Sequence, residues 1–126
     1  MESIHRLFLL ITGIVHLLPF SFMILPGQLQ KSYGVDMTDP NLQLLLRHRA
    51  LFFGMIGGFL LYSVIKKRYY GWASVLGLVS MGSFVLLYYT IGGINTQLRD
   101  VMMIDIYLFF PLLVITLLYF FNIRNF

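Results

Sequence analysis

The stretch Asn41-Leu-Gln-Leu-Leu-Leu-Arg-His-Arg-Ala-Leu-Phe-Phe-Gly54, which continues without a charge to Ile65, decides how this chain is built. Only Leu51 to Ile65 is free of charged residues, and about 15 residues are short for a membrane span, which needs about 20. A helix here crosses a bilayer only if Arg47, His48 and Arg49 lie within its outer part. Because hydrocarbon cannot hydrate a guanidinium group, we expect neighbouring helices to turn polar groups toward this stretch.

The composition supports a membrane location. The 126 residues are 59% hydrophobic and 17% aromatic, and only 11% are charged, whereas a soluble domain covers its surface with charged residues. The chain has no cysteine, which excludes disulfides, thiol catalysis and Cys-ligated metals. No metal site or cofactor is predicted. The net charge of +4 comes from basic residues near the predicted membrane edges, so we expect membrane lipids rather than nucleic acid as partners.

We predict an all-α fold, a four-helix transmembrane bundle formed by a single domain of residues 1–126. The spans are expected at about residues 4–25, 40–65, 71–94 and 101–123. Asp39-Pro40 has the pattern of a helix N-cap followed by proline at the first helical position.

The connections and internal prolines follow from the same pattern. We expect Pro26-Gly27 to end the first helix, residues 28–38 to form an interfacial turn or short helix, and residues 95–100 to close the third span. Pro19 and Pro111 lie inside predicted spans, where each removes a backbone hydrogen bond and favours a kink.

The basic residues predict the orientation. If Arg47 and Arg49 are embedded in the membrane, two cations flank one side and five flank the other, which places both termini in the cytoplasm. The first group is Lys31 and Arg99, and the second is Arg6, Lys66, Lys67, Arg68 and Arg124.

Several polar residues fall at one depth. At about 1.5 Å of rise per helical residue, each lies roughly 6 to 14 Å below the outer boundary of the bilayer. They are the candidate ligand-binding residues: Arg47, His48, Arg49, His16, Asp105 and Tyr88.

Helical periodicity predicts which of these residues face the bundle. Arg47 shares a stripe with the small residues Ala50, Gly54 and Gly58, so we expect it to point inward. Arg49 lies about 200° away and is expected to reach another neighbour or the head groups. On the first helix, His16 aligns with His5, Leu9 and Thr12.

The charges within this layer do not balance. Asp105 is the only acid at depth and neutralises one arginine, so a bound anion would complete the site. The alternative is structural: Arg47 pairs with Asp105 while Arg49 reaches a lipid phosphate. His48, between two arginines, is expected to stay neutral and able to accept a proton.

A family resemblance rests on three motifs: Leu44-Leu-Leu-Arg-His-Arg-Ala50 followed by Phe53-Gly54, His16-Leu-Leu-Pro19, and Tyr33-Gly34-Val35. Together they resemble a group of small four-helix bacterial inner-membrane proteins close to the DoxX-like set. The resemblance covers nearly the whole chain and implies this fold and a multi-pass location. Some members carry the label phosphopantetheine adenylyltransferase, a soluble α/β enzyme with a His-x-Gly-His motif that this sequence lacks.

Three functions therefore stand beside one another. The first is a membrane protein that binds an anionic amphiphile, such as a lipid or isoprenoid phosphate or a fatty acid, through Arg47, His48 and Arg49. The second is a redox subunit in which His16 and His48 bind haem or approach a quinone, as DoxX-like relatives are associated with quinone-linked oxidoreductase complexes. The third is a structural subunit of a larger membrane complex. A small transporter acting as a homo-oligomer is a further alternative.

Overall fold

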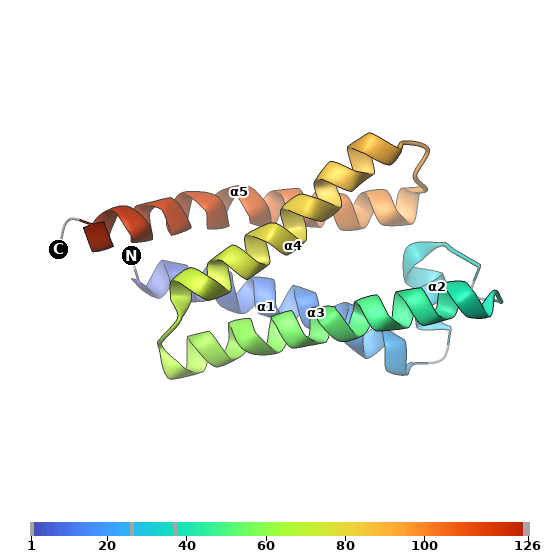
Figure 1. The fold of residues 1–126 in the computed structure, drawn as a ribbon, viewed down its shortest axis with the longest axis horizontal. Coiled ribbons are helices and arrows are strands. Elements are labelled where there is room, and N and C mark those ends of the chain that lie inside the picture. Colours follow the sequence, from blue (N-terminus) through green and yellow to red (C-terminus); the bar gives the residue numbers. More distant parts are fainter. Residues whose placement is uncertain (1, 26, 37, 125–126) are drawn as a thin grey trace.

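The computed structural model describes residues 2–25, 27–36 and 38–124, with side chains as far as Phe121. Pro26 and the side chain of Arg124, to which the sequence assigned roles, lie outside this description. The described residues contain no strand, and the all-α prediction is confirmed. They form five helices, labelled in Figure 1: α1 (Glu2–Ile24), α2 (Gln28–Tyr33), α3 (Pro40–Lys66), α4 (Tyr70–Ile91) and α5 (Thr96–Arg124).

Four of these helices, α1, α3, α4 and α5, are long and apolar enough to cross a membrane. Their outward surfaces carry large apolar side chains, and Ile65, Trp72 and Ile91 are exposed by 73%, 72% and 69%. Water disfavours such surfaces, whereas the hydrocarbon of a bilayer accommodates them. The molecule is therefore built as an integral membrane protein with four spans.

The long helices alternate in direction along one axis (Figure 1). The start of α1, the α3–α4 turn and the end of α5 lie at one end of the bundle, which we call the α3–α4 end. The short helix α2, the start of α3 and the α4–α5 connection lie at the opposite end, called the α2 end. The most extensive packing joins α1 to α3 and α4 to α5.

The start of α3 matches its sequence signal. Asp39 is the N-cap, its side chain accepts a hydrogen bond from the amide of Asn41 at 2.9 Å, and Pro40 is the first helical residue. The segment before it contains the short helix α2, one of the two forms expected there. Pro19 and Pro111 each lie inside a continuous helix, α1 and α5.

The connection between α4 and α5 differs from the prediction. The helix α4 ends at Ile91, three residues earlier than expected, because Gly92 and Gly93 both adopt positive φ angles of 74° and 68°. Residues 95–100 were predicted to close this span. Instead, they form the start of α5, with Asn95 immediately before its first helical residue. The side chain of Asn95 accepts a hydrogen bond from the amide of Leu98 at 2.8 Å, which makes it the cap of α5.

Glycines bring α1 and α3 close together. A Cβ atom added at Gly57 would lie 2.8 Å from the carbonyl oxygen of Gly13, and one at Gly54 would lie 2.6 Å from the ring of Phe20. Close packing at Gly54 was expected from the small-residue stripe of α3, whereas Gly57 lies outside that stripe. The same expectation for Gly58 is wrong, because nothing lies within 4 Å of its Cβ position.

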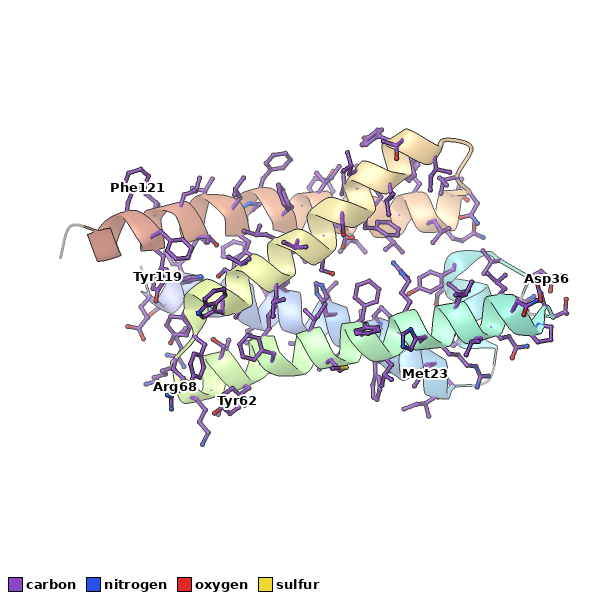
Figure 2. All side chains as sticks on the ribbon, in the orientation of Figure 1. Met23, Asp36, Tyr62, Arg68, Tyr119 and Phe121 are labelled. Carbon is purple, nitrogen blue, oxygen red and sulfur yellow. The ribbon has the colours of Figure 1, made fainter. Side chains whose placement is uncertain are left out.

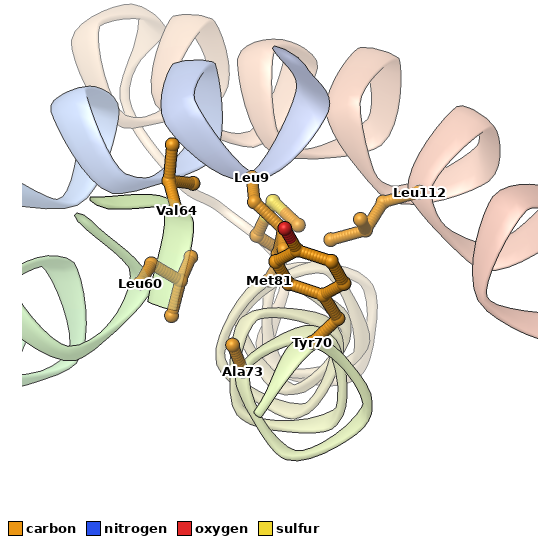
Figure 3. Close-up of a cluster of buried hydrophobic side chains, with 7 residues drawn as sticks. All are labelled: Leu9, Leu60, Val64, Tyr70, Ala73, Met81 and Leu112. Carbon is orange, nitrogen blue, oxygen red and sulfur yellow. The ribbon is translucent and has the colours of Figure 1, made fainter. Parts of the chain in front are cut away.

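A buried apolar core lies between the two ends of the bundle. Leu9, Leu60 and Leu112 are 0% exposed and Met81 is 1% exposed, so all four long helices contribute to it. Figure 3 shows these side chains together with Val64, Tyr70 and Ala73. On α1, His5, Leu9, Thr12 and His16 are all buried, which confirms that they share one inward face.

Candidate ligand-binding site

A pocket of about 180 Å³ lies toward the α2 end, between α1, α2, α3 and α5. Its lining is mainly hydrocarbon with a few polar groups, the usual composition of a site for an organic ligand. The apolar lining is Val15, Leu18, Pro19, Phe22, Phe53, Val101 and Ile104, and the polar lining is His16, Ser32, Tyr33, Arg49 and Asp105.

The pocket wall includes two residues that reach the outer surface of the bundle. Leu18 of α1 is 47% exposed and Ile104 of α5 is 48% exposed. Pro19 lies beside Leu18 in the wall, and because proline has no amide hydrogen, the carbonyl of Val15 lacks the donor that an uninterrupted helix would supply. The pocket therefore has an apolar edge that faces outward.

Arg49 is the cation of this pocket. Its side chain is half-buried, and its guanidinium carbon lies 4.4 Å from the ring centre of Phe53, 5.2 Å from Phe84 and 5.5 Å from Tyr33. Aromatic faces stabilise a cation electrostatically but accept few hydrogen bonds. No carboxylate among the described side chains lies within 4.0 Å of the guanidinium. The Tyr33 hydroxyl interacts with one of its donors, and the remaining donors can serve an acceptor from a ligand.

Asp105 faces the same pocket from α5 and is half-buried. It is close enough to Arg49 for their charges to attract, although the two groups make no ion pair within 4.0 Å. The pocket thus holds one cation and one acid that are separated from each other. The excess of positive charge expected from two embedded arginines is not found here.

His16 is buried and both of its ring nitrogens are engaged. Nδ1 lies 2.8 Å from the carbonyl oxygen of Thr12, and because a carbonyl only accepts, Nδ1 carries the proton and donates it. In the neutral ring Nε2 is then an acceptor, and the Ser80 hydroxyl donates to it at 2.9 Å. The ring also packs edge-on against Phe53. His16 therefore forms part of the pocket wall in a fixed tautomer.

Tyr33 enters the site from α2, and the sequence had singled it out only as part of a family motif. It is 3% exposed, and burial raises the pKa of its hydroxyl, an effect that the neighbouring Arg49 guanidinium opposes. The Asn95 side chain donates to the carbonyls of Tyr33 at 2.9 Å and Gly34 at 3.2 Å. These bonds tie α2 to the start of α5, so that α2 covers the pocket. The sequence signal was a single aromatic residue before a glycine in a polar segment.

Arg47 and His48 do not line this pocket. The prediction that Arg47 points into the bundle is wrong, because Arg47 is exposed. Arg49 reaches other neighbours, one of the two outcomes expected for it, and it is the arginine that lines the pocket. Arg47 does lie on the side of α3 that faces α1, in a separate depression beside Phe22. Because Phe22 belongs to the last part of α1, little of the chain covers the Arg47 side chain there. His48 is exposed and stacks edge-on against Phe52 at 4.7 Å.

Tyr88 is half-buried and lies on the other side of Arg49. It lines a neighbouring pocket of about 260 Å³ with Arg49, Phe84 and Leu98. Of the six predicted residues, the structure brings His16, Arg49 and Asp105 together, with Tyr88 adjacent. Two haem ligands would have to face one site, but His16 lines the pocket and His48 does not.

No protein-family model, curated protein or solved structure shows significant similarity to this chain. The resemblance to the DoxX-like group, and the quinone association that it implies, therefore stay predictions.

Proposed function

We propose that this protein binds the carboxylic acid head group of a single-chain amphiphile, such as a fatty acid, in the pocket around Arg49. The observation that carries the proposal is the Arg49 guanidinium, which is stacked among aromatic rings, faces an apolar pocket and has no carboxylate within 4.0 Å among the described side chains. A carboxyl group matches the planar fork of a guanidinium and accepts two hydrogen bonds from it.

The acid opposite Arg49 favours a carboxylic acid over a phosphate. Two carboxyl groups at one site share a proton, so a ligand acid can accept from Arg49 and be joined to Asp105 by one hydrogen bond. A phosphate monoester carries close to two negative charges, and Asp105 would repel it. Of the anionic amphiphiles expected from the sequence, we therefore favour the fatty acid over the lipid and isoprenoid phosphates.

The pocket size supports a ligand that is only partly enclosed. Its volume of about 180 Å³ is below the roughly 300–1,000 Å³ of pockets that enclose a whole small molecule. A head group and the first carbons of a chain fit such a volume. The remaining chain would leave between Leu18 and Ile104, where the surface is apolar and faces the hydrocarbon of a bilayer.

The membrane location belongs to the same proposal. We infer an inner membrane of a bacterium with both termini in the cytoplasm, as the basic residues suggest. The fold is consistent with this orientation, because most of the basic residues assigned to the cytoplasmic side lie at one end of the bundle. The start of α1 and the α3–α4 turn meet there and carry Arg6, Lys66, Lys67 and Arg68 (Figure 1). Pocket residues such as Asp105 would then lie in the outer half.

The test compares two arginines that are two residues apart on α3. The full-length protein and its Arg49→Gln and Arg47→Gln variants are purified in detergent and titrated with oleic acid, and the bound fraction is measured by native mass spectrometry. We expect Arg49→Gln to weaken binding by about tenfold or more, because a charge-assisted hydrogen bond is lost. Arg47→Gln, which removes an exposed charge, should change it by less than about twofold.

Two results would reject the proposal. If both variants lost affinity equally, the fatty acid would be attracted by overall charge and not held in the pocket. If the unaltered protein did not retain oleic acid beyond an uncharged alcohol of the same chain length, the pocket would have no carboxylic acid specificity.

A further inference from the structure

A second cavity lies at the α3–α4 end and shares no lining residue with the first pocket. Its volume is about 330 Å³, and its walls come from the start of α1, the α3–α4 turn and the last part of α5. Figure 2 shows Arg68 of the turn and Tyr119 of α5 at this end of the molecule. The cavity therefore lies where three parts of the chain that are distant in sequence meet.

The α3–α4 turn holds its basic residues on a constrained backbone. Lys67 and Tyr69 both have positive φ angles, 55° and 64°, a conformation that costs on the order of 1 kcal/mol or more for residues other than glycine. The Ser63 hydroxyl donates to the carbonyl of Arg68, and the amide of Arg68 donates to the carbonyl of Ser63 at 3.2 Å. These bonds fix the turn, so the Lys67 and Arg68 side chains start from defined positions at the cavity.

The cavity lining has more positive than negative charge. Lys67 and Arg68 contribute two cations, and Glu2 contributes one carboxylate. The Glu2 carboxylate already accepts a hydrogen bond from the Tyr70 hydroxyl at 3.3 Å. The Arg68 guanidinium lies 4.6 Å from the ring centre of Tyr69, a cation–π contact that leaves its hydrogen-bond donors available.

A buried histidine contributes to the cavity wall. His5 is 1% exposed, and its Nε2 lies 2.7 Å from the hydroxyl oxygen of Ser74. Its Nδ1 has no hydrogen-bond partner within the part of the chain that the structure describes. The ring is held between Tyr70 and Tyr119, whose ring centres lie 5.5 and 5.1 Å away. His5 lines the cavity, so this nitrogen is one of the groups that a ligand there could contact.

A neighbouring arginine adds a further positive charge at this end of the bundle. The Nε atom of Arg6 is buried and has no hydrogen-bond partner among the described residues. Arg6 directly follows His5 in α1 and lies close enough to Tyr70 for their charges to interact. Arg6 does not line the cavity, so it adds positive charge near this end without being one of the contacts in the cavity wall.

We propose that this cavity binds a phosphate group. A phosphate presents several acceptor oxygens in different directions, which suits donors that approach from α1, the turn and α5 better than a planar carboxylate does. The cations of Lys67 and Arg68, together with the Tyr119 hydroxyl, would surround it. The group can belong to a phospholipid head group, because the cavity lies at the end of the spanning helices, or to a soluble phosphate compound.

The experiment removes one charge inside and one outside the cavity. Arg68→Gln changes a lining side chain but leaves the backbone bonds of Arg68 to Ser63 intact, whereas Lys66→Gln changes an exposed residue of the same turn that does not line the cavity. The full-length proteins in detergent are titrated separately with dioleoylphosphatidylglycerol and with inorganic pyrophosphate. Diacylglycerol with the same chains serves as the phosphate-free probe, and native mass spectrometry measures the bound fraction.

We expect at least one phosphate probe to bind, diacylglycerol not to bind, and Arg68→Gln to weaken binding about fivefold to tenfold while Lys66→Gln changes it less than about twofold. Binding of phosphatidylglycerol alone identifies a lipid head group, and binding of pyrophosphate, with or without the lipid, identifies a site for free phosphate groups. An equal effect of the two variants, or no binding of either phosphate probe, would overturn the proposal. Because the two cavities share no residue, Arg49→Gln should leave this binding unchanged.

Discussion

The two ends of the bundle contain similar buried groups that are satisfied to different degrees. Each end has a buried histidine of α1 whose Nε2 is bonded to a serine of α4, His16 to Ser80 at 2.9 Å and His5 to Ser74 at 2.7 Å. The Nδ1 of His16 also donates to the Thr12 carbonyl, whereas the Nδ1 of His5 has no partner among the described residues. Both nitrogens of His16 are therefore bonded, one of them to its own helix, whereas the residue four positions before His5 lies outside the described part of the chain.

This difference changes which residues carry chemistry at each end. At the α2 end the open donors belong to Arg49, and the histidine only shapes the wall. At the α3–α4 end the nitrogen without a partner among the described residues belongs to the histidine itself, beside Arg68. Judged by residue type and burial alone, His16 and His5 would be given the same role. Only the hydrogen-bond partners distinguish a structural histidine from one that can contact a ligand.

The largest effect is expected from moving α1, which carries both histidines. Gly57→Ala would put a Cβ atom 2.8 Å from the backbone oxygen of Gly13, so α1 and α3 must separate. We expect the free energy of unfolding to fall by about 1–3 kcal/mol and both cavities to lose their ligands. The change in the free energy of unfolding is measured by denaturing the variant and the unaltered protein in mixed detergent micelles.

The matched control for this substitution is one residue along the chain. Gly58 has nothing within 4 Å of its Cβ position, so Gly58→Ala should be neutral or slightly stabilising. A similar loss of stability in both variants would show that helix flexibility, and not the α1–α3 contact, is responsible.

A smaller effect, limited to one end, is expected from Asn95→Ala. This change removes the cap of α5 and the two hydrogen bonds that tie α2 to it, at a cost of about 1–2 kcal/mol. Hydrogen exchange should become faster in α2, and oleic acid binding should weaken while phosphate binding does not. Thr96→Ala, at the exposed neighbouring position, is the control. Loss of binding at both ends would contradict the independence of the two cavities.

The smallest effect is expected from the two serines, and it tests the comparison directly. Ser80→Ala and Ser74→Ala each remove one hydrogen bond between α1 and α4, worth on average about 0.6 kcal/mol inside a membrane. Nitrogen NMR of labelled histidine should show that His16 keeps its Nδ1–H tautomer in Ser80→Ala, because the Thr12 carbonyl still accepts. In Ser74→Ala, His5 should lose its fixed form. A change of tautomer at His16 would contradict the assignment of Nδ1 as the donor to the Thr12 carbonyl.

The sequence predicted the features that depend on local pattern. Four spans follow from hydrophobic length, the start of α3 follows from Asp39-Pro40, and the inward face of α1 follows from the spacing of His5, Thr12 and His16. Each of these depends on chemistry within one segment. The relative angle between two residues of one helix is fixed by helical geometry.

The sequence could not predict how each helix is rotated against its neighbours. Arg47 and Arg49 were correctly separated by angle, but which of them faces the pocket depends on where α1 ends and how α2 folds over it. The burial of Tyr33 depends on the position of α2, which is bonded to Asn95, a residue far away in sequence. Asn95 itself was assigned to the end of a span, since its capping bond to Leu98 becomes evident only once Gly92 and Gly93 have ended α4.

The apolar core between the two cavities has a consequence for transport. Leu9, Leu60, Met81 and Leu112 offer neither donors nor acceptors, and the Thr12 and Thr116 hydroxyls donate to carbonyls of their own helices. A proton or ion that entered at one mouth would meet an insulating layer before it reached the other. Within the described part of the chain, these core side chains therefore provide no series of open donors and acceptors that joins the two cavities.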